Sequence, residues 1–504
     1  MKKFTARLTT ALLCAAMVVS TFAACANNEE EKKPNVVDPN KQQETQEDTP
    51  EFEEEDWGGR TYTILSKQDE ETDFIDHFID NEDFNGEPIN DAVVTRNQLA
   101  EEKYNIKVER QSHDHGYAAQ ASKSGTVDFE VIYDWGIRMA RIVMDGVCYD
   151  FNQLPYIDLT QDYWAPNMHE DLTIADKMMM ATCDISMNRI AWASVYFFNK
   201  TMMDELNLEY PYSYVTSNTW TFDVLLSQIL AASQDDGDQI WTVYDRYGMA
   251  GSGSVGLPIG CANIPSVTRR EDGSFEIPPV NERLVSLYTE WSKKMITYSY
   301  AFANFKMDEW LTTVDQSQYE SVYKAARGAE FGSGRILYFG GSLDMTGEFT
   351  DVPFQYGVCP GPKYDTTDEF SSGIDTCAPL FAIPKQADLE FAGMIMEYLA
   401  YESEQHLLPA FYDQTLKTKR MDDEQSRDDA MIDIVRDTAK YPTTGLYYLV
   451  ITNAEGDCWN PPATIRSEML AAGNFASVYK RYKDSAQKSL DDFYDKMLML
   501  DVNK

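Results

Sequence analysis

The sequence predicts an α/β protein built from two lobes. Short runs of β-branched and aromatic residues alternate with helix-length amphipathic segments in the first third of the body, the pattern of a parallel sheet covered by helices. Strand-like runs and apolar helices resume late in the sequence, after a less regular middle. About 450 residues follow Trp57, too many for one ordinary core, which favours two lobes.

The body opens in the order strand, helix, strand, strand and helix. Alternation of apolar and polar residues predicts strands, and apolar residues at helical spacing predict helices. The predicted elements are strand 61–65, helix 90–104, strands 106–109 and 129–133, and a helix that starts over 137–143. In the helix over 90–104, Val93, Val94, Leu99 and Tyr104 are expected on the buried face.

The remaining elements follow the same reasoning. Helices are predicted over 221–232, 281–297 and 308–314, a strand over 335–339, and strands over 354–358 and 379–384. An apolar helix over 389–401 and an amphipathic helix over 478–500 complete the series. The last helix should bury Tyr479, Tyr482, Leu490, Phe493 and Met497.

The amino terminus has the three parts of a secretory signal. Lys2, Lys3 and Arg7 precede an apolar stretch over 11–19, and small residues stand before Cys25. The stretch is shorter than the about 20 apolar residues of a membrane anchor. The run 22–25, Phe-Ala-Ala-Cys, resembles the bacterial lipobox with Phe in place of its usual Leu. The resemblance implies a signal peptide over 1–24 and lipidation of Cys25; a plain signal peptide is the alternative.

Residues 26–56 are dominated by Glu, Asp, Gln, Asn, Lys and Pro and have no apolar periodicity. Such a segment cannot bury enough apolar surface to offset the entropy cost of ordering it. The segment 25–56 is therefore expected to be a lipidated cysteine followed by a disordered acidic spacer.

Charge and cysteine content narrow the function classes. A formal net charge of −40 argues against nucleic acid and anionic lipid as partners, because both require a basic surface. The cysteines after Cys25 form no Cys-x-x-Cys pair, so a zinc or iron–sulfur site is not expected. Cys359 and Cys377, which flank one loop, suggest a disulfide, with buried thiols as the alternative.

Three segments share one feature, a strand-like run that leads into a polar, aromatic or helical segment. They are 128–135 (Asp-Phe-Glu-Val-Ile-Tyr-Asp-Trp), 195–200 (Val-Tyr-Phe-Phe-Asn-Lys) followed by Trp220-Thr221, and 356–401, from Tyr-Gly-Val through Ala382-Ile383-Pro384 into a helix. In this order they resemble the extracellular solute-binding proteins of bacterial ABC importers, in particular their sugar-binding group. The resemblance implies a periplasmic-binding-protein-like fold, with crossing hinge strands and a ligand cleft between the lobes. It also implies lobe 1 over 57–190 plus 353–405 and lobe 2 over 191–352 plus 406–504.

The aromatic and polar sets in this sequence suit a sugar, whose ring offers an apolar face and a rim of hydroxyls. Open α/β sheets bind ligands at strand ends and in the loops beyond them, where these sets lie. Packing in the core or at the surface is the alternative for each aromatic residue. The predicted ligand-binding residues are Asp134, Trp135, Arg138, Trp192, Trp241, Tyr244, Asp245, Tyr338, Gly340 and Trp459.

Other chemical motifs lack the context that would support them. Gly251, Gly253 and Gly256 have dinucleotide-turn spacing, but no clear strand precedes them and Pro258 interrupts any following helix. The segments 113–115, His-Asp-His, and 235–238, Asp-Asp-Gly-Asp, are expected to be a solvated loop and a turn. We therefore expect no cofactor, no metal site and no catalytic centre.

The prediction is a monomeric, lipid-anchored substrate-binding component of an ABC importer. It would capture an oligosaccharide or related carbohydrate outside the cytoplasm and deliver it to membrane permease subunits. A receptor for a peptide or other metabolite is the alternative within transport. Alternatives from other classes are an exported glycoside hydrolase, for which the 83 acidic residues supply carboxylate pairs without favouring any, and an adhesive surface protein.

Overall fold

The computed structural model describes most of the chain after residue 49. The described residues are 50–67, 78–80, 83–113, 116–250, 267–279, 282–303, 305–319, 321–349, 352–375, 377–417, 425–440 and 475–500. The predicted signal peptide, Cys25 and most of the acidic spacer lie outside these ranges, as do Cys261, Cys458 and Trp459.

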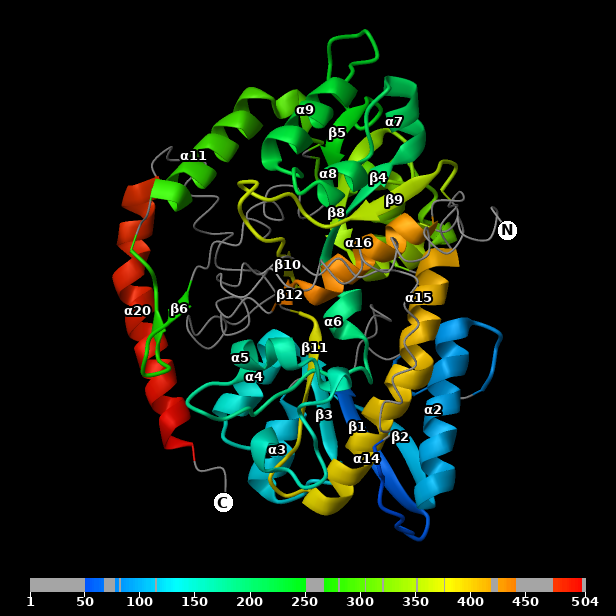
Figure 1. Cartoon of the computed structure of the whole chain (residues 1–504), viewed down its shortest axis with the longest axis vertical. Helices are drawn as coiled ribbons and strands as arrows, with labels where there is room; N and C mark the ends of the chain where they lie inside the picture. The colour runs from blue at the N-terminus through cyan, green and yellow to red at the C-terminus, as the bar shows by residue number, and fades with distance from the viewer. Residues whose placement is uncertain are drawn as a thin grey trace, which may run out of the picture. The chain divides into compact units, whose positions relative to one another are not determined.

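One four-stranded sheet is formed by the first strands of the body and one late strand (Figure 1). Its order is β11-β3-β1-β2, with β1 parallel to β2 and β3, and β11 antiparallel to β3. The strands are β1 (Arg60–Lys67), β2 (Ile106–His113), β3 (Val131–Trp135) and β11 (Pro379–Ala382). Four of the predicted strands therefore share one sheet, and three of them are parallel, as the alternating pattern indicated.

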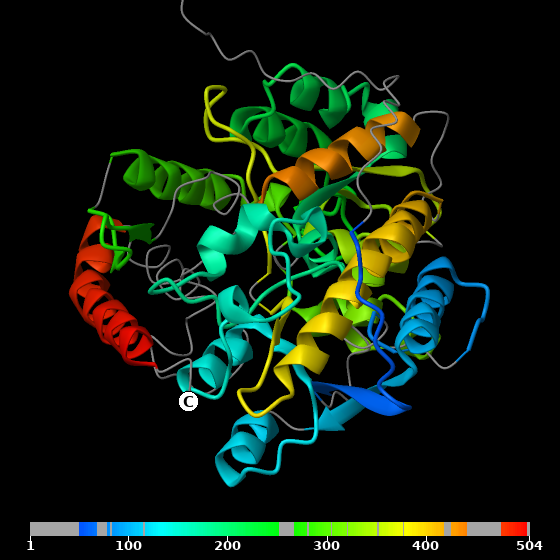
Figure 2. The same cartoon turned by 60° about the horizontal axis from the view of Figure 1, so that its bottom comes forward.

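Helices flank this sheet (Figure 2), whose strands β3 and β11 are buried along most of their length, whereas the edge strand β2 alternates buried and exposed residues. The Tyr62 hydroxyl on β1 donates to the Ala392 carbonyl of α14 at 3.1 Å, and the Phe391 ring of α14 lies edge-on to Tyr62. The helices are α2 (Pro88–Tyr104), α3 (Tyr117–Ser124), α4 (Gly136–Met144) and α14 (Leu389–Glu402). In α2, Val93, Val94 and Tyr104 are buried as predicted, whereas Leu99 is only half-buried and Arg96 is fully buried.

The second sheet has the order β5-β8-β4-β9 and completes the two-lobed α/β fold. Strand β5 is parallel to β8, and β4 is antiparallel to both β8 and β9. Its strands are β4 (Ser194–Asn199), β5 (Tyr247–Ala250), β8 (Ile336–Ser342) and β9 (Tyr356–Cys359). The predicted lobe boundary at residue 353 would assign β9 to the first lobe. Because β9 pairs with β4, it belongs to the second sheet, and the chain returns to the first sheet after Cys359. The lobe boundaries stay a prediction.

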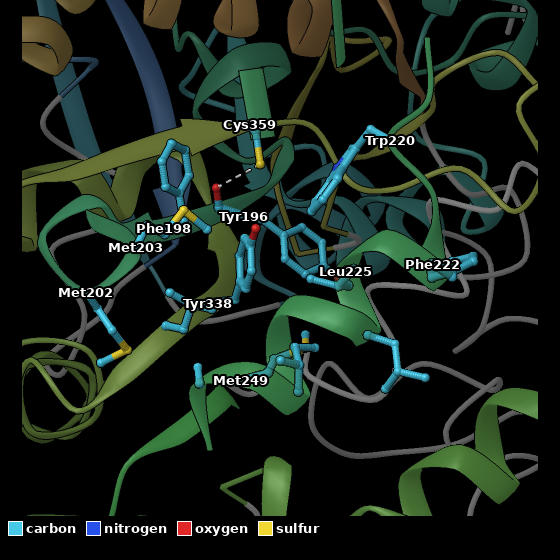
Figure 3. Close-up of a cluster of buried hydrophobic side chains, with 14 of the residues drawn as sticks. Tyr196, Phe198, Met202, Met203, Trp220, Phe222, Leu225, Met249, Tyr338 and Cys359 are labelled. Atoms are coloured by element: carbon cyan, nitrogen blue, oxygen red, sulfur yellow. Dashed lines mark hydrogen bonds between the residues drawn. The ribbon is translucent and has the colours of Figure 1, made fainter. Parts of the chain in front are cut away.

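Aromatic side chains fill both faces of the second sheet, which explains why 195–198 is an unbroken apolar run. On one face Tyr196, Phe198 and Trp220 pack with Tyr338 (Figure 3). On the other face the Phe197 ring lies 5.1 Å from that of Phe349. The surrounding helices are α7 (Lys200–Leu206), α8 (Pro211–Thr216), α9 (Phe222–Ala232), α12 (Met307–Leu311), α13 (Val322–Glu330) and α16 (Gln425–Asp437).

The Asn-Lys pair that ends β4 has a structural role. Asn199 caps α7 by accepting a hydrogen bond from the Met202 N–H at 2.9 Å. The Lys200 ammonium is buried 3.5 Å from the Asp428 carboxylate of α16, and Asp428 also accepts from the Tyr212 hydroxyl. These contacts join α7 and α8 to a helix more than 200 residues away in sequence.

The remaining elements connect or flank the two sheets. Strands β6 (Thr268–Arg269) and β7 (Phe275–Glu276) form a hairpin that packs on α20 (Phe475–Met499), where Leu490, Phe493 and Met497 are buried as predicted. Strands β10 (Ser372–Gly373) and β12 (Ala439–Lys440) pair in parallel. The other helices are α5 (His169–Leu172), α6 (Asn188–Ala191), α11 (Glu282–Thr297) and α15 (Leu408–Lys417).

The cysteines in the described residues are thiols. Cys148, Cys183, Cys359 and Cys377 are buried and form no disulfide with one another. The suggested pairing of Cys359 with Cys377 is therefore wrong. The Cys359 thiol instead donates to the Tyr196 carbonyl at 3.6 Å within the core of the second sheet (Figure 3).

Candidate functional site

Two of the predicted tryptophans meet where the chain passes from one sheet to the other. Trp135 ends β3 at the carboxyl edge of the first sheet, and Trp192 lies two residues before β4 opens the second. Both half-buried rings pack against Ile137 and Cys377 in one small apolar cluster. Residues 57 positions apart in sequence therefore pack on one apolar cluster at the crossing.

Two crossing segments run side by side and fix the position of Trp192. The Asp375 N–H donates to the Trp192 carbonyl at 3.1 Å, and the Ser194 hydroxyl donates to the Gly373 carbonyl at 2.7 Å. The Leu343 N–H, just beyond β8, donates to the Ala193 carbonyl at 3.1 Å. The carboxyl end of β8 thus lies at the same crossing as Trp192, and carboxyl edges are where open α/β sheets bind ligands.

Polar residues flank the aromatic pair on the first sheet. Asp134 is buried at the end of β3, and its carboxylate accepts a hydrogen bond from the Trp135 N–H at 2.7 Å. Arg138 is half-buried on α4, three residues beyond Trp135. Trp135 directly precedes α4, so Arg138 lies in the first turn of the helix that follows the tryptophan.

Two further carboxylates, which sequence reasoning missed, lie next to the crossing. Burial, together with the charges of Glu348 and Asp375, raises the pKa of Asp344, one residue after Leu343, to about 6. Desolvation by the surrounding protein also raises the pKa of Asp375, although this residue is exposed. Asp344 could have been found as the acidic residue closest after the predicted strand over 335–339.

The cavity beside Asp134 is too small to hold a sugar. It measures about 10 Å³, room for about one water molecule, and Ser66, His113 and Tyr133 contribute to its lining. A ligand of the size of a sugar ring would therefore have to lie outside this cavity, in space open to solvent.

The predicted set Trp241, Tyr244 and Asp245 lies away from the crossing. Tyr247, which opens β5, pairs with Ile336 at the start of β8, whereas the crossing contacts the far end of β8. Seven strand residues separate the two edges, a distance on the order of 20 Å. Asp245 is buried and structures its own loop, accepting hydrogen bonds from the Asp236 and Thr242 N–H groups.

Two predicted residues belong to strand β8 itself. Tyr338 is fully buried in the core cluster (Figure 3), and its hydroxyl donates to the Gln228 side-chain carbonyl. Gly340 is buried in the middle of the sheet opposite Tyr196. Tyr338 therefore lies in the core of the second sheet and not at the crossing, and its role as a ligand contact stays a prediction. Trp459 and the predicted lipidation site Cys25 lie outside the described residues.

The motifs that suggested a metal have ordinary surroundings. The His113 ring at the end of β2 stacks on the Tyr117 ring at 3.7 Å, and the rest of the His-Asp-His segment lies outside the described residues. Asp235, Asp236 and Asp238 bring carboxylate oxygens within 4.8 Å of one another in a loop. Their carboxylates accept hydrogen bonds from the loop's own backbone, as in the turn predicted for this segment.

None of the helices in the described part of the chain combines the length and the apolar character needed to cross a membrane.

Comparison with known proteins identifies the fold. No protein-family model matches the chain, and no curated protein matches it in sequence. The cyclic α-maltosyl-1,6-maltose-binding protein of Arthrobacter globiformis aligns with a TM-score of 0.52 and 14% identity over 86% of this chain and 100% of its own. An ABC transporter solute-binding protein from Thermotoga lettingae, bound with α-D-tagatose, aligns with a TM-score of 0.51 and 13% identity. This alignment covers 86% of this chain and 100% of that one.

A third solved structure is an ABC substrate-binding protein from Listeria monocytogenes in complex with cycloalternan. It aligns with a TM-score of 0.50 and 12% identity over 87% of this chain and 99% of its own. At such identities the likeness concerns the fold, and it extends over nearly the whole body. The chain therefore has the two-lobed α/β fold of the sugar-binding group of ABC-transporter solute-binding proteins, the family that its sequence motifs resemble.

Proposed function

We propose that this chain is the substrate-binding component of an ABC importer and captures an oligosaccharide or related carbohydrate between its two lobes. The observation that carries the proposal is that Trp135 and Trp192 both pack on the cluster of Ile137 and Cys377 at the crossing, where the carboxyl ends of β3 and β8 also lie. The structural neighbours that bind cycloalternan, cyclic maltosyl-maltose and tagatose agree with a carbohydrate ligand.

The chemistry of the crossing suits a sugar. A pyranose ring has an apolar face that packs on an indole and a rim of hydroxyls that need donors and acceptors. Trp135 and Trp192 supply the aromatic surface, Arg138 supplies donors, and Asp344 and Asp375 supply acceptors. Asp134, whose carboxylate accepts from the Trp135 N–H, would contribute a further acceptor.

Capture would work by closure of the two lobes. A ligand that contacts both sheets' edges only when the lobes are closed binds the closed form more tightly, and so shifts the equilibrium towards it. Residues from the first sheet, such as Trp135, and from beyond β8, such as Asp344, would then contact one ligand together.

Calorimetric titration of the mature protein against a panel of neutral oligosaccharides tests the proposal. At least one sugar should bind, and Trp135→Ala and Trp192→Ala should each weaken its binding by about tenfold or more, because truncating an aromatic anchor costs on the order of 2 kcal/mol. The matched control is Tyr323→Ala, which removes an exposed aromatic ring from α13.

Three results would each redirect the assignment. Heat with peptides and none with any sugar would make the protein a peptide receptor. Release of new reducing ends from a bound glycan would make it a glycoside hydrolase. Absence of any small-molecule ligand would favour an adhesive surface protein.

We further propose that the protein is a monomer held at the outer face of the cell membrane by a lipid on Cys25. The lipobox-like run before Cys25 and the acidic segment that follows it support this placement. A tether keeps the receptor near its permease and raises its effective concentration there.

A further inference from the structure

Two exposed tyrosines and a half-buried tryptophan lie at the edge of the second sheet opposite to the crossing. Trp241 and Tyr244 belong to the loop over 233–246, between α9 and β5, and Tyr300 follows α11. The Trp241 and Tyr300 rings lie 5.7 Å apart at 36°. We call these three residues the aromatic platform. Tyr244 and Tyr300 are 58% and 40% exposed, and Ile240 beside them is 63% exposed.

The loop that carries the platform is held in one conformation. Gln234 and Arg246 exchange two backbone hydrogen bonds at 2.9 and 3.0 Å, which close the loop at its base. The buried Asp245 carboxylate accepts from the Asp236 and Thr242 N–H groups, and the Tyr247 hydroxyl donates to the Thr242 carbonyl at 2.9 Å. A surface that is ordered before a ligand arrives loses less entropy on binding.

Charged groups share the loop of the platform or lie beside one of its rings. The Arg335 guanidinium lies 5.6 Å from the centre of the Tyr244 ring, and Asp236 and Asp238 are exposed on the same loop. Carboxylate acceptors and a guanidinium donor in the same segment as aromatic rings match the hydroxyls and apolar faces of sugars. A purely apolar protein partner would leave these charges without partners.

We propose that the aromatic platform is a second carbohydrate-binding site, which holds a polysaccharide on the outer surface of the second lobe. An open surface encloses little of a single sugar, so useful affinity requires several contiguous sugar units, whereas the crossing would take one short ligand. The site lies on the order of 20 Å from the crossing, because β8 separates the two, and it goes beyond the proposed transport function.

Native gel electrophoresis through soluble polysaccharides tests this site. The gels contain starch, xylan, mixed-linkage β-glucan or galactomannan, and retardation against a polysaccharide-free gel measures binding. At least one polymer should retard the wild type. Trp241→Ala and Tyr300→Ala should each weaken that retardation by about threefold to tenfold, as expected for loss of one stacking contact. Trp135→Ala at the crossing and Tyr323→Ala on α13 should leave it unchanged.

The variants distinguish loss of polysaccharide binding at the platform from loss of oligosaccharide binding at the crossing. Oligosaccharide binding in the calorimeter should persist in Tyr300→Ala, whose exposed ring can be removed without opening the core. Thermal denaturation checks that Trp241→Ala, which loses packing on Tyr247, is folded. The inference is overturned if no polymer retards the wild type, or if Trp135→Ala alone abolishes retardation. A dimer that Trp241→Ala dissociates in sedimentation equilibrium would assign the platform to a second copy of the chain instead.

Discussion

At the scale of single residues, burial decides what a side chain can do. Arg96 illustrates a fully buried charge that is satisfied structurally: its guanidinium donates to the Ile79 and Ile185 carbonyls and to the Asn97 side chain at 2.8 to 3.0 Å. Desolvation still lowers its pKa to about 10. Arg96 thus ties α2 to two distant segments, which nothing in the apolar pattern of that helix indicated.

Asp344 is the opposite case, a carboxyl that burial destabilises. Its folded-state pKa of about 6 lies above the ordinary 3.8, so the folded protein binds this proton more tightly than the unfolded chain does. Stability therefore falls as the pH rises through this window, and the full cost is present above about pH 6. Asp344→Asn should raise the free energy of unfolding by about 1–3 kcal/mol at about pH 7.5, with little change at about pH 4.

Urea denaturation at the two pH values measures this effect. Asp308→Asn, at an exposed position on α12, is the matched control and should have no effect at either pH. Equal effects of Asp344→Asn at both pH values would mean that desolvation of the carboxylate is not the cause. A stabilising variant that also weakens sugar binding would fit a binding residue whose burial costs stability.

At the scale of elements, the buried pair Lys200 and Asp428 joins helices from distant parts of the chain. The Lys200 side chain is 2% exposed and Asp428 is 0% exposed, so removing either charge leaves the other without compensation. Lys200→Met and Asp428→Asn should each reduce the free energy of unfolding by about 3–5 kcal/mol. The asparagine keeps an acceptor for the Tyr212 hydroxyl and the Val358 N–H.

The double variant Lys200→Met with Asp428→Asn distinguishes this pair from independent packing. It should cost clearly less than the sum of the two single variants, because no unpaired charge stays buried. Denaturant unfolding of all four proteins measures the difference. Strictly additive losses would show that the two residues stabilise the fold separately.

Element prediction succeeded where a strand or helix has a clear pattern of its own. Strands β1, β2, β3, β8 and β11 and the helices α2, α9, α11 and α14 lie where alternation or helical spacing placed them. Helix α3 is short and rich in Ala and Ser, and β5 has only four residues, so neither gives a periodic signal. Missing β5 also hid the fact that Trp241 precedes a strand and so lies at its amino edge.

At the scale of the whole molecule, local sequence patterns could identify only some of the residues that lie at the crossing. Trp135 and Trp192 were both predicted, yet their packing depends on how two crossing segments pair, which involves residues 373 to 375. The sequence could not show that Tyr338 is buried, because a strand that is apolar on both faces gives no sign of which aromatic residue is accessible. Asp344 follows a predicted strand and could be found in the sequence, whereas Asp375 reaches the crossing only through the pairing of distant segments.

The predicted spacer would connect the two lobes to a lipid at the cell membrane. A flexible segment of the length of 26–56 would have a root-mean-square reach on the order of 30 Å, enough for the lobes to close freely beside a permease. Cys25→Ala should therefore release the protein from the membrane fraction into the medium and abolish labelling with radioactive palmitate. Oligosaccharide affinity should not change, because the described lobes begin beyond the spacer.

Cys14→Ala is the matched control, since Cys14 lies within the apolar stretch of the predicted signal and would be removed with it. This variant should stay in the membrane fraction and keep its palmitate label. Retention of Cys25→Ala at the membrane would contradict lipid anchoring through that residue. Release of both variants would show that Cys25 is not the specific determinant, and the function at the crossing would then have to operate without a tether.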